Sequence, residues 1–185
     1  MTIRSLFAGA ALALALATPA LAEDSVIVGG MEMYPSKNIV ENAVNSADHT
    51  TLVAAVQAAG LVDTLASAGP FTVFAPVNAA FAELPAGTVE TLLKPENKAT
   101  LTAVLTYHVV AGKVTAADVV AAIKAGGGKA TLTTVQGGML TATMNGPMNV
   151  VVTDENGNSA NIVTYDVMQS NGVIHVIDAV LLPKS

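Results

Sequence analysis

The sequence contains no cysteine and no tryptophan, and its single arginine is Arg4. The lack of cysteine excludes disulfides, thiol catalysis, Cys-ligated zinc and iron–sulfur clusters, so packing and hydrogen bonds must stabilise the fold. Only four Phe and three Tyr are present, which leaves little material for a carbohydrate site built on aromatic rings. Lys and Arg number 8 against 14 Asp and Glu, a formal net charge of −6. Without a basic surface to neutralise phosphates, no nucleic-acid partner is expected.

The one long hydrophobic run lies at the start of the chain and has the organisation of a secretory signal peptide. Arg4 precedes an unbroken apolar run over residues 6–17, and Ala20-Leu21-Ala22 has the small-x-small pattern of a cleavage site before Glu23. The alternative is a membrane anchor, but the run is shorter than the ~20 residues that a bilayer span needs. The sequence therefore predicts a signal peptide over 1–22, a periplasmic or extracellular location, and no membrane span in the mature protein.

The first half of the chain beyond this leader has mostly helical patterning. Residues 23–37 are expected to form an extended lead-in. Apolar residues recur at helical spacing over 38–68, and a second helical stretch covers 95–109. Between them, the run 71–76 (FTVFAP) has the composition of a short strand that ends at its proline.

The rest of the chain begins with one more helix and then changes to β patterning. Thr115 and Asp118 form a capping-box pattern at the start of this helix, and Gly126-Gly127-Gly128 is expected to end it. Residues 131–182 form β-rich runs separated by Gly-Gly or Asn-Gly pairs, and Asn-Gly between strands is a strong hairpin signal. Helices followed by an antiparallel meander predict an α+β fold, with helices packed on a sheet or sandwich in one domain over 38–183.

Three segments, in this order and spacing, resemble the signatures of the fasciclin domain family. They are Thr72–Phe81 (TVFAPVNAAF), Leu105–Val110 (LTYHVV) and Asn171–Pro183 (NGVIHVIDAVLLP). The residues that carry the motifs are Phe74, Pro76, Asn78, Phe81, Asn171, Gly172 and His175. Asn78 is expected to cap a short helix through Phe81. The chain departs from the family at Val77, where Thr is common, a change that concerns packing.

The resemblance implies the fold and the class of function. It implies a wedge-shaped β-sandwich with a packed helical layer, as in single-domain bacterial secreted members. It also implies a role in cell adhesion or matrix binding, because the family is a class of binding modules rather than of enzymes.

The Tyr-His segment is one candidate for contact with a partner. The resemblance ties this region to integrin recognition in some animal members, which makes Tyr107 and His108 candidate contact residues. His108, however, shares a helical face with Leu101, Val104 and Leu105, so it is expected to point inward. The favoured interpretation is a buried imidazole bonded to a backbone carbonyl, next to a Tyr107 ring whose hydroxyl finds a polar partner.

A second candidate is the stretch Asp166, Val167 and Met168. With Asn171-Gly172 it resembles the Asp-Ile-Met segment that is associated with integrin binding in matrix members of the family. Asp166 and Met168 are expected to reach solvent between a strand over 159–167 and the Asn171-Gly172 turn. The favoured interpretation, however, is an ordinary strand end and turn with Val167 packed inside.

No metal site or cofactor is expected. His49 is predicted to be exposed at a helix start, whereas His175 is predicted to be buried in a strand that is apolar on both faces. None of the three histidines is paired at ligand spacing. The turn Asp154–Asn158 offers oxygen ligands for a weak cation site, but a solvated hairpin is the favoured interpretation.

The sequence therefore predicts a non-catalytic adhesion module that binds a cell-surface or matrix protein or a polysaccharide. It contains neither a G-x-S-x-G elbow nor a phosphate-binding loop of the GKT type, so no enzyme activity is expected. The alternative is a carrier of an apolar small molecule such as a pigment or lipid, because seven Met and Ala/Val-rich helices can line an adaptable pocket. The oligomeric state is left open.

Overall fold

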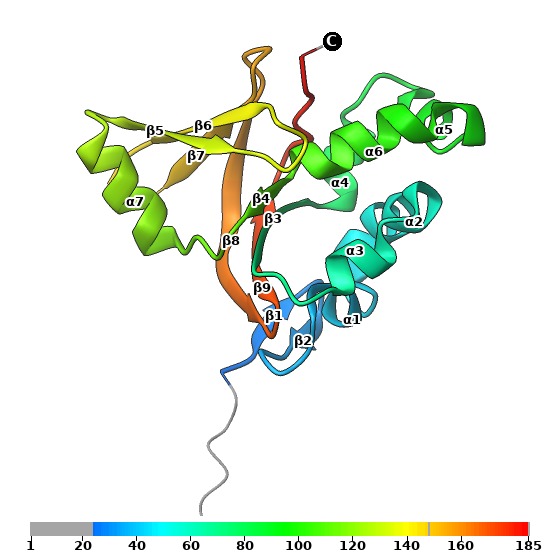
Figure 1. Cartoon of the computed structure of the whole chain (residues 1–185), viewed down its shortest axis with the longest axis horizontal. Coiled ribbons are helices and arrows are strands. Elements are labelled where there is room, and N and C mark those ends of the chain that lie inside the picture. Colours follow the sequence, from blue (N-terminus) through cyan, green and yellow to red (C-terminus); the bar gives the residue numbers. More distant parts are fainter. Residues whose placement is uncertain (1–23, 148, 185) are drawn as a thin grey trace, which may run out of the picture.

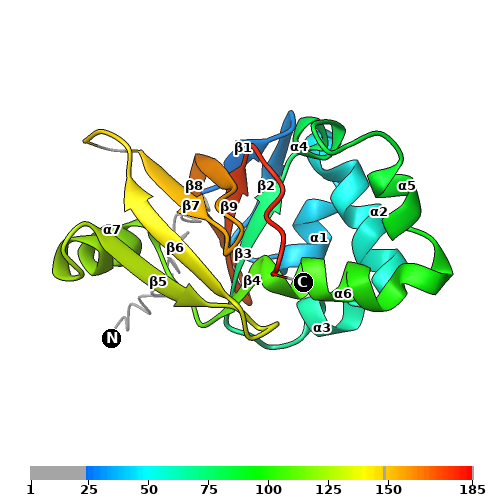
Figure 2. The same cartoon turned by 90° about the horizontal axis from the view of Figure 1, so that it is seen from above.

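The structure, a computed structural model, describes residues 24–147 and 149–184, and the predicted signal peptide lies outside them. The chain forms a strongly bent sheet with a helical layer on one side and a single helix, α7, at the other end (Figure 1). Seen from above, β5, β6 and β7 lie with α7 on one side of the molecule, and α1 to α6 lie on the other (Figure 2). The predicted α+β class is therefore confirmed.

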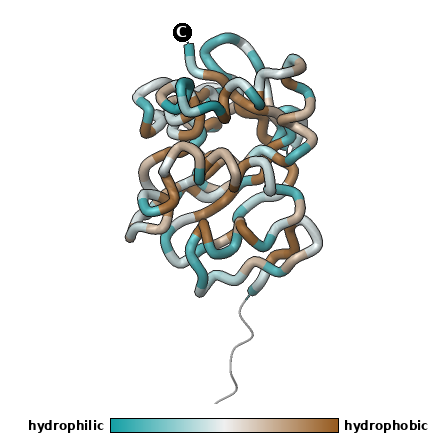
Figure 3. Tube along the Cα trace, turned by 90° about the vertical axis from the view of Figure 1, so that its right-hand side faces the viewer, coloured by the Kyte–Doolittle hydropathy of each residue, from teal (hydrophilic) through white to brown (hydrophobic). Residues whose placement is uncertain are grey.

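The helical layer contains six short helices, and four of them lie in the stretches 38–68 and 95–109 that the apolar periodicity predicts. They are α1 (Ile39–Ala43), α2 (Thr50–Ala59), α3 (Val62–Ala66), α4 (Asn78–Ala82), α5 (Thr88–Leu92) and α6 (Lys98–Tyr107), with 3₁₀ turns η1 (Ala47–His49) and η2 (Pro95–Asn97). Asn38 begins α1 in a capping box with Glu41, and Gly60 ends α2 at a φ of 73°. Hydrophilic and hydrophobic segments alternate along the trace (Figure 3). Helix α2 shows the resulting pattern, since it buries one apolar stripe that includes Leu52 and Val56.

The expected lead-in forms a small hairpin. Strands β1 (Val26–Val28) and β2 (Met31–Met33) pair antiparallel on either side of Gly29-Gly30. Val28 and Met33 are buried against the helical layer, so this segment contributes to the core.

Seven strands form the main sheet. They are β3 (Phe71–Pro76), β4 (Val109–Ala111), β5 (Lys129–Thr133), β6 (Met139–Met144), β7 (Val150–Thr153), β8 (Ser159–Gln169) and β9 (Gly172–Ile177). Their order is β4-β3-β9-β8-β7-β6-β5, and β5 to β9 form the predicted antiparallel meander. Strand β3, however, pairs with β9 in parallel, an arrangement that the sequence did not predict. A bridge between Val110 and Thr134 joins the two ends of the sheet, which gives the wedge the character of a nearly closed barrel.

Strand β8 bends the sheet because its register with β9 shifts twice. The shifts lie between Ile162 and Thr164 and between Thr164 and Val167. Asp166 lies in this bulge at a φ of 52°, the one positive φ of a non-glycine residue in the described ranges. A bulge of this kind increases the local twist, and here it lets β8 join the two halves of the sheet.

Helix α7 (Ala116–Ala125) begins and ends as predicted. The Thr115 side chain accepts a bond from the Asp118 amide, and the Asp118 side chain accepts one from the Thr115 amide. Gly127 and Gly128 follow the helix at φ values of 70° and 106°, so the glycine run ends it.

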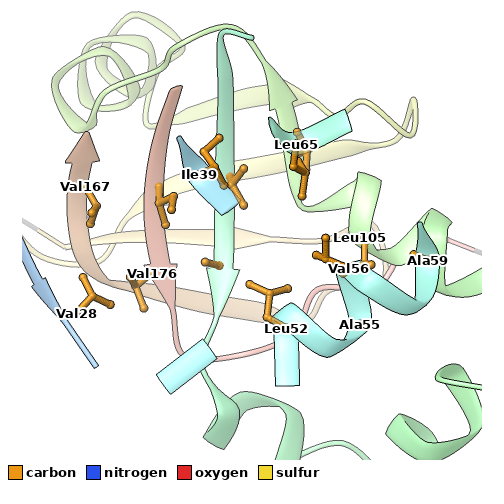
Figure 4. Packing of buried hydrophobic residues seen from close by; sticks show 14 of the residues in the cluster. Val28, Ile39, Leu52, Ala55, Val56, Ala59, Leu65, Leu105, Val167 and Val176 are labelled. Atoms are coloured by element: carbon orange, nitrogen blue, oxygen red, sulfur yellow. The ribbon is translucent and has the colours of Figure 1, made fainter. Parts of the chain in front are cut away.

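Two large apolar cores lie on opposite faces of the sheet, and a small third cluster contains Ala80, Val104 and Val180. One fills the space between the sheet and α1, α2, α3 and α6, and Figure 4 shows Ile39, Leu52, Leu65 and Leu105 gathered there. The other lies between the two halves of the sheet under α7. Strand β3 is buried on both faces, since Val73 belongs to the first core and Phe74 to the second.

Candidate functional site

An apolar cavity of about 200 Å³ lies in the helical core, between the helices and strands β3 and β9. Its walls are aliphatic side chains such as Ile39, Leu52 and Leu65. Val44 and Gln57 also line it, and because both are exposed, the cavity reaches the surface between α1 and α2. A concave, mostly apolar space with few polar groups is the usual form of a small-molecule site.

His49 is the polar residue that distinguishes this cavity. The prediction that it is exposed is wrong, because only 1% of its surface is accessible. Its Nδ1 lies 2.9 Å from the hydroxyl of Ser46, whereas its Nε2 has no hydrogen-bond partner. Burial lowers the pKa of His49, although the Ala75 backbone and the Asp48 carboxylate partly oppose the shift. The ring is therefore neutral near pH 7.

His108 also lines the cavity, but both of its ring nitrogens are bonded to the backbone. Nδ1 donates to the carbonyl of Val104 at 2.8 Å, and Nε2 accepts from the amide of Leu181 at 3.0 Å. The predicted buried imidazole on a backbone carbonyl is confirmed. Complete burial lowers the pKa of His108 to about 4, so the ring is neutral and ties α6 to the C-terminal segment.

Tyr107 points into the other core, on the opposite side of the chain from His108. Its side chain is fully buried, and its hydroxyl donates to the carbonyl of Met139 at 2.9 Å and accepts from the amide of Glu155 at 3.2 Å. Two consecutive buried side chains thus fix α6 to both halves of the molecule. Neither presents a surface to a partner protein.

The turn at Asp154–Asn158 is the predicted solvated hairpin between β7 and β8, because residues 155–158 are exposed, but Asp154 itself turns inward. Asp154 is buried, and its carboxylate accepts bonds from the amides of Asn156, Asn158 and Leu182 at 2.9 Å each. These bonds occupy the carboxylate and hold the C-terminal segment in place. Within residues 24–147 and 149–184, no group of three His, Cys, Asp or Glu side chains is arranged to hold a metal ion.

His175 is buried in β9, as predicted, and its two nitrogens support the bulge in β8. Nε2 donates to the carbonyl of Val114 at 2.9 Å, and Nδ1 accepts from the amide of Asp166 at 3.3 Å. Its ring stacks on Phe74 at 5.7 Å between centroids, and burial lowers its pKa. This histidine therefore positions the backbone where β8 changes direction.

The three residues Asp166, Val167 and Met168 lie within β8 and not after its end. The expected position between a strand and a turn is wrong, because β8 continues to Gln169. Val167 is fully buried, whereas Asp166 and Met168 are half-buried. Asp166 Oδ1 accepts from the amide of Ala116 at 2.7 Å, which links the bulge to the start of α7.

Asn78 caps a different helix from the one expected. The cap residue of α4 is Val77, and no side chain bonds there. Instead, Asn78 Oδ1 accepts from the amide of Thr51 at 3.0 Å, and its Nδ2 donates to the carbonyl of Ala47 at 2.8 Å. Asn78 therefore fixes the first turn of α2, immediately after His49.

The other residues of this signature are structural as well. Pro76 is buried in β3, and Phe81 packs against the core.

Asn171 and Gly172 join the β8–β9 turn to the helical layer. Asn171 Oδ1 accepts from the amide of Ile39, and Nδ2 donates to the carbonyls of Leu65 and Ser67. Gly172 does not have the positive φ of a hairpin glycine; it begins β9, where a Cβ would lie 2.0 Å from the carbonyl oxygen of Phe71. Asn171 thus holds two residues of the cavity wall, Ile39 and Leu65, while Gly172 allows β9 to approach β3 closely.

The structure therefore gives most of the predicted residues a structural role. Tyr107, His108, Asn78, Asn171 and His175 hold segments of the fold together. The cavity and the unpartnered nitrogen of His49 were missed by sequence reasoning. Only the Ala/Val-rich helices and the number of methionines hinted at a pocket, and of the methionines Met33 lines it.

The comparisons with known proteins agree on one family. The fasciclin domain model matches residues 47–183. Protein sll1483 of Synechocystis sp. is 46% identical over 171 residues, which cover 91% of this chain and 86% of that protein. The cell surface glycolipoprotein MPB83 of Mycobacterium bovis is 35% identical over 163 residues, which cover 85% of this chain and 64% of that protein.

A solved structure of a FAS1 domain pair from the insect cell adhesion molecule Fasciclin I has the same fold. It superimposes with a TM-score of 0.72 at 19% identity, over 80% of this chain and 52% of that chain. This chain thus spans about half of the solved pair. The likeness confirms the predicted wedge-shaped fold.

Proposed function

Because the chain belongs to the fasciclin domain family, we propose that it is an exported, non-catalytic adhesion module that binds a protein or polysaccharide on a cell surface or in a matrix. The family match over residues 47–183 is the observation that carries the proposal. Two relatives support it: one is named a cell surface glycolipoprotein, and the other comes from a cell adhesion molecule. Two of the three histidines, His108 and His175, bond to the backbone through both ring nitrogens, which favours structural roles over catalysis.

The proposal includes export to the periplasm or the extracellular space. It rests on the signal-peptide pattern of residues 1–22, followed by a short lead-in over 23–37 and the domain over 38–183. Within the described ranges, none of the helices is both long and apolar enough to cross a bilayer.

The contact surface that we propose is the exposed side of β8 at Asp166 and Met168. Of the candidate contact residues, these two keep part of their surface accessible, whereas Tyr107, His108 and Val167 are buried. A carboxylate beside a flexible thioether side chain suits a partner that presents a cation next to an apolar patch.

A double change at these two positions tests the surface. Asp166→Asn keeps a side-chain oxygen for the Ala116 amide and tolerates a positive φ, while Met168→Gln keeps the length of the side chain. The control is Val163→Ala, at an exposed position of the same strand. The assay measures attachment or aggregation of cells that lack the gene. Added wild-type protein and the control variant should both restore it. The double variant should be about fivefold less effective at an unchanged melting temperature. Equal rescue by the folded double variant would reject this surface.

The cavity beside His49 favours a second candidate function, carriage of an apolar small molecule such as a pigment or lipid. The cavity is lined by aliphatic side chains and reaches the surface. Organic extraction of protein purified from its native source, followed by mass spectrometry and absorption spectroscopy, tests this function. A stoichiometric apolar compound in the extract is expected, and an empty extract would count against carriage without affecting the adhesion proposal.

A further inference from the structure

We propose that the cavity binds a small neutral molecule that is largely apolar and carries one hydroxyl group, and that this hydroxyl bonds to Nε2 of His49. The inference rests on the second candidate function and deepens it, because it names the polar group of the ligand and the atom that recognises it.

The first observation is that Nε2 of His49 has no hydrogen-bond partner. Among the residues that the structure describes, His49 Nε2 is the one buried side-chain nitrogen or oxygen without a hydrogen-bond partner. The side chain is only 1% exposed, and the residue lines the cavity. Buried polar groups in native proteins are almost always bonded, so an unpaired nitrogen in a residue that lines a cavity indicates a missing partner.

The chemistry of the ring selects the hydroxyl. A buried, neutral imidazole has one N–H donor and one acceptor, and Ser46 can pair with Nδ1 in either role. Nε2 therefore offers a donor in one tautomer and a lone pair in the other. A hydroxyl satisfies both, since it donates and accepts. A carboxylate or an ammonium group would lose its hydration among aliphatic side chains, so the ligand is neutral.

A buried water is a poorer occupant than such a ligand. A stable internal water needs two to four polar partners. His108 also faces the cavity, but both of its nitrogens are engaged by the backbone, and Gln57 lies at the exposed rim. The Ala75 backbone also lies beside the ring, so a water at His49 would have that carbonyl as its second partner, the fewest that hold an internal water.

The volume limits the size of the ligand. The cavity measures about 200 Å³. An engineered apolar cavity of about 150 Å³ takes up benzene, so a single-ring phenol or an alcohol of similar bulk fits. The apolar body would lie against Leu52 and Leu65, with its hydroxyl toward His49.

The experiment compares phenol with toluene, which have the same shape and differ in one polar group. Binding to the full mature chain is followed by NMR, including the ¹⁵N shifts of the imidazole. His49→Asn keeps a polar group near the position of Nδ1 and removes Nε2, whereas His49→Gln places an amide near the position of Nε2. The preference for phenol over toluene should fall about tenfold in His49→Asn and be largely retained in His49→Gln.

Filling the cavity tests the location independently. Ala43 lines the cavity, and Ala54 is an exposed alanine on α2 outside it. Ala43→Leu should weaken both probes, and the matched control Ala54→Leu should leave them unchanged. If the variants at His49 do not fold, the ¹⁵N spectrum of the wild-type protein is sufficient for the test. Phenol should shift the Nε2 resonance of His49, and toluene should not.

The outcomes separate this inference from the carrier proposal. If both probes bind but phenol leaves Nε2 unaffected, or His49→Asn preserves the preference, the hydroxyl contact is wrong and carriage of an apolar molecule stands. If neither probe binds, the inference is wrong, and the native extract decides the carrier proposal separately. A water at Nε2 that phenol does not displace would also overturn it.

Discussion

Substitution of His108 by glutamine should reduce the acid sensitivity of the fold. In the native protein both nitrogens of His108 are bonded to the backbone, and burial lowers the pKa of the ring from 6.5 to about 4. Above pH 6.5 the ring is neutral in the folded and unfolded chains. Between pH 6.5 and about pH 4 the unfolded chain takes up a proton that the folded chain does not. The free energy of unfolding must therefore fall as the pH falls through this window.

The size of the effect follows from the pKa shift. One unit of pKa difference corresponds to about 1.4 kcal/mol, so at pH 4.5 this single group lowers the free energy of unfolding by about 2 kcal/mol relative to pH 7. Glutamine at 108 can offer its oxygen to the Leu181 amide but loses the bond to the Val104 carbonyl. At pH 7 the variant should therefore be less stable by about 1–3 kcal/mol. Its stability should also change less with pH.

Urea unfolding of both proteins at pH 7, 5.5 and 4.5 measures the difference directly. The carboxylates, His49 and His175 contribute to the pH dependence of both proteins, so subtraction isolates His108. We expect the stability gap between wild type and variant to shrink by about 2 kcal/mol from pH 7 to pH 4.5. Two stability curves that run parallel across this range would refute the reasoning, because they would mean that the ring is not held neutral by the fold.

Three further changes test other parts of the structure. Asn78→Ala removes the side chain that bonds to the first turn of α2, and should lower the free energy of unfolding by about 1–2 kcal/mol in urea titrations. Gly172→Ala forces a Cβ to within 2.0 Å of the Phe71 oxygen, so this variant should fail to accumulate as folded protein. The control Gly30→Ala has no atom within 4 Å of the new Cβ and should cost only about 1 kcal/mol for its positive φ. N-terminal sequencing of the exported protein should begin at Glu23, and a chain that retains its first residue in the membrane fraction would contradict the predicted leader.

Sequence reasoning succeeded where the deciding interactions are local. The Thr115–Asp118 capping box and the glycine stop of α7 depend on residues a few positions apart, so their pattern was sufficient. The strand over 71–76 was found for the same reason, because its apolar run and its proline mark both ends. The burial of His108 and His175 followed from the apolar residues around them in the helix and the strand.

Sequence reasoning failed where a residue acts on a distant segment. Asn78 looks like the cap of its own helix, yet it bonds to residues 27 and 31 positions earlier, because the fold brings α2 beside the start of α4. Asp166 was expected in a turn and lies in a bulge that depends on His175 and on the start of α7. The parallel pairing of β3 with β9 joins segments about 100 residues apart, which no local pattern reveals.

The sequence alone thus determined the family, the α+β class and the helices and hairpins that local patterns encode. Only the tertiary structure decided the environment of His49. Its neighbours Asp48 and Thr50 are exposed, so nothing beside it in the chain indicates burial. The ring is buried because α1, α2 and β3 close around it, and the same packing leaves a cavity that His49 lines and leaves its Nε2 without a hydrogen-bond partner. A cavity is a property of surfaces that meet in space, and residues distant in the sequence supply those surfaces.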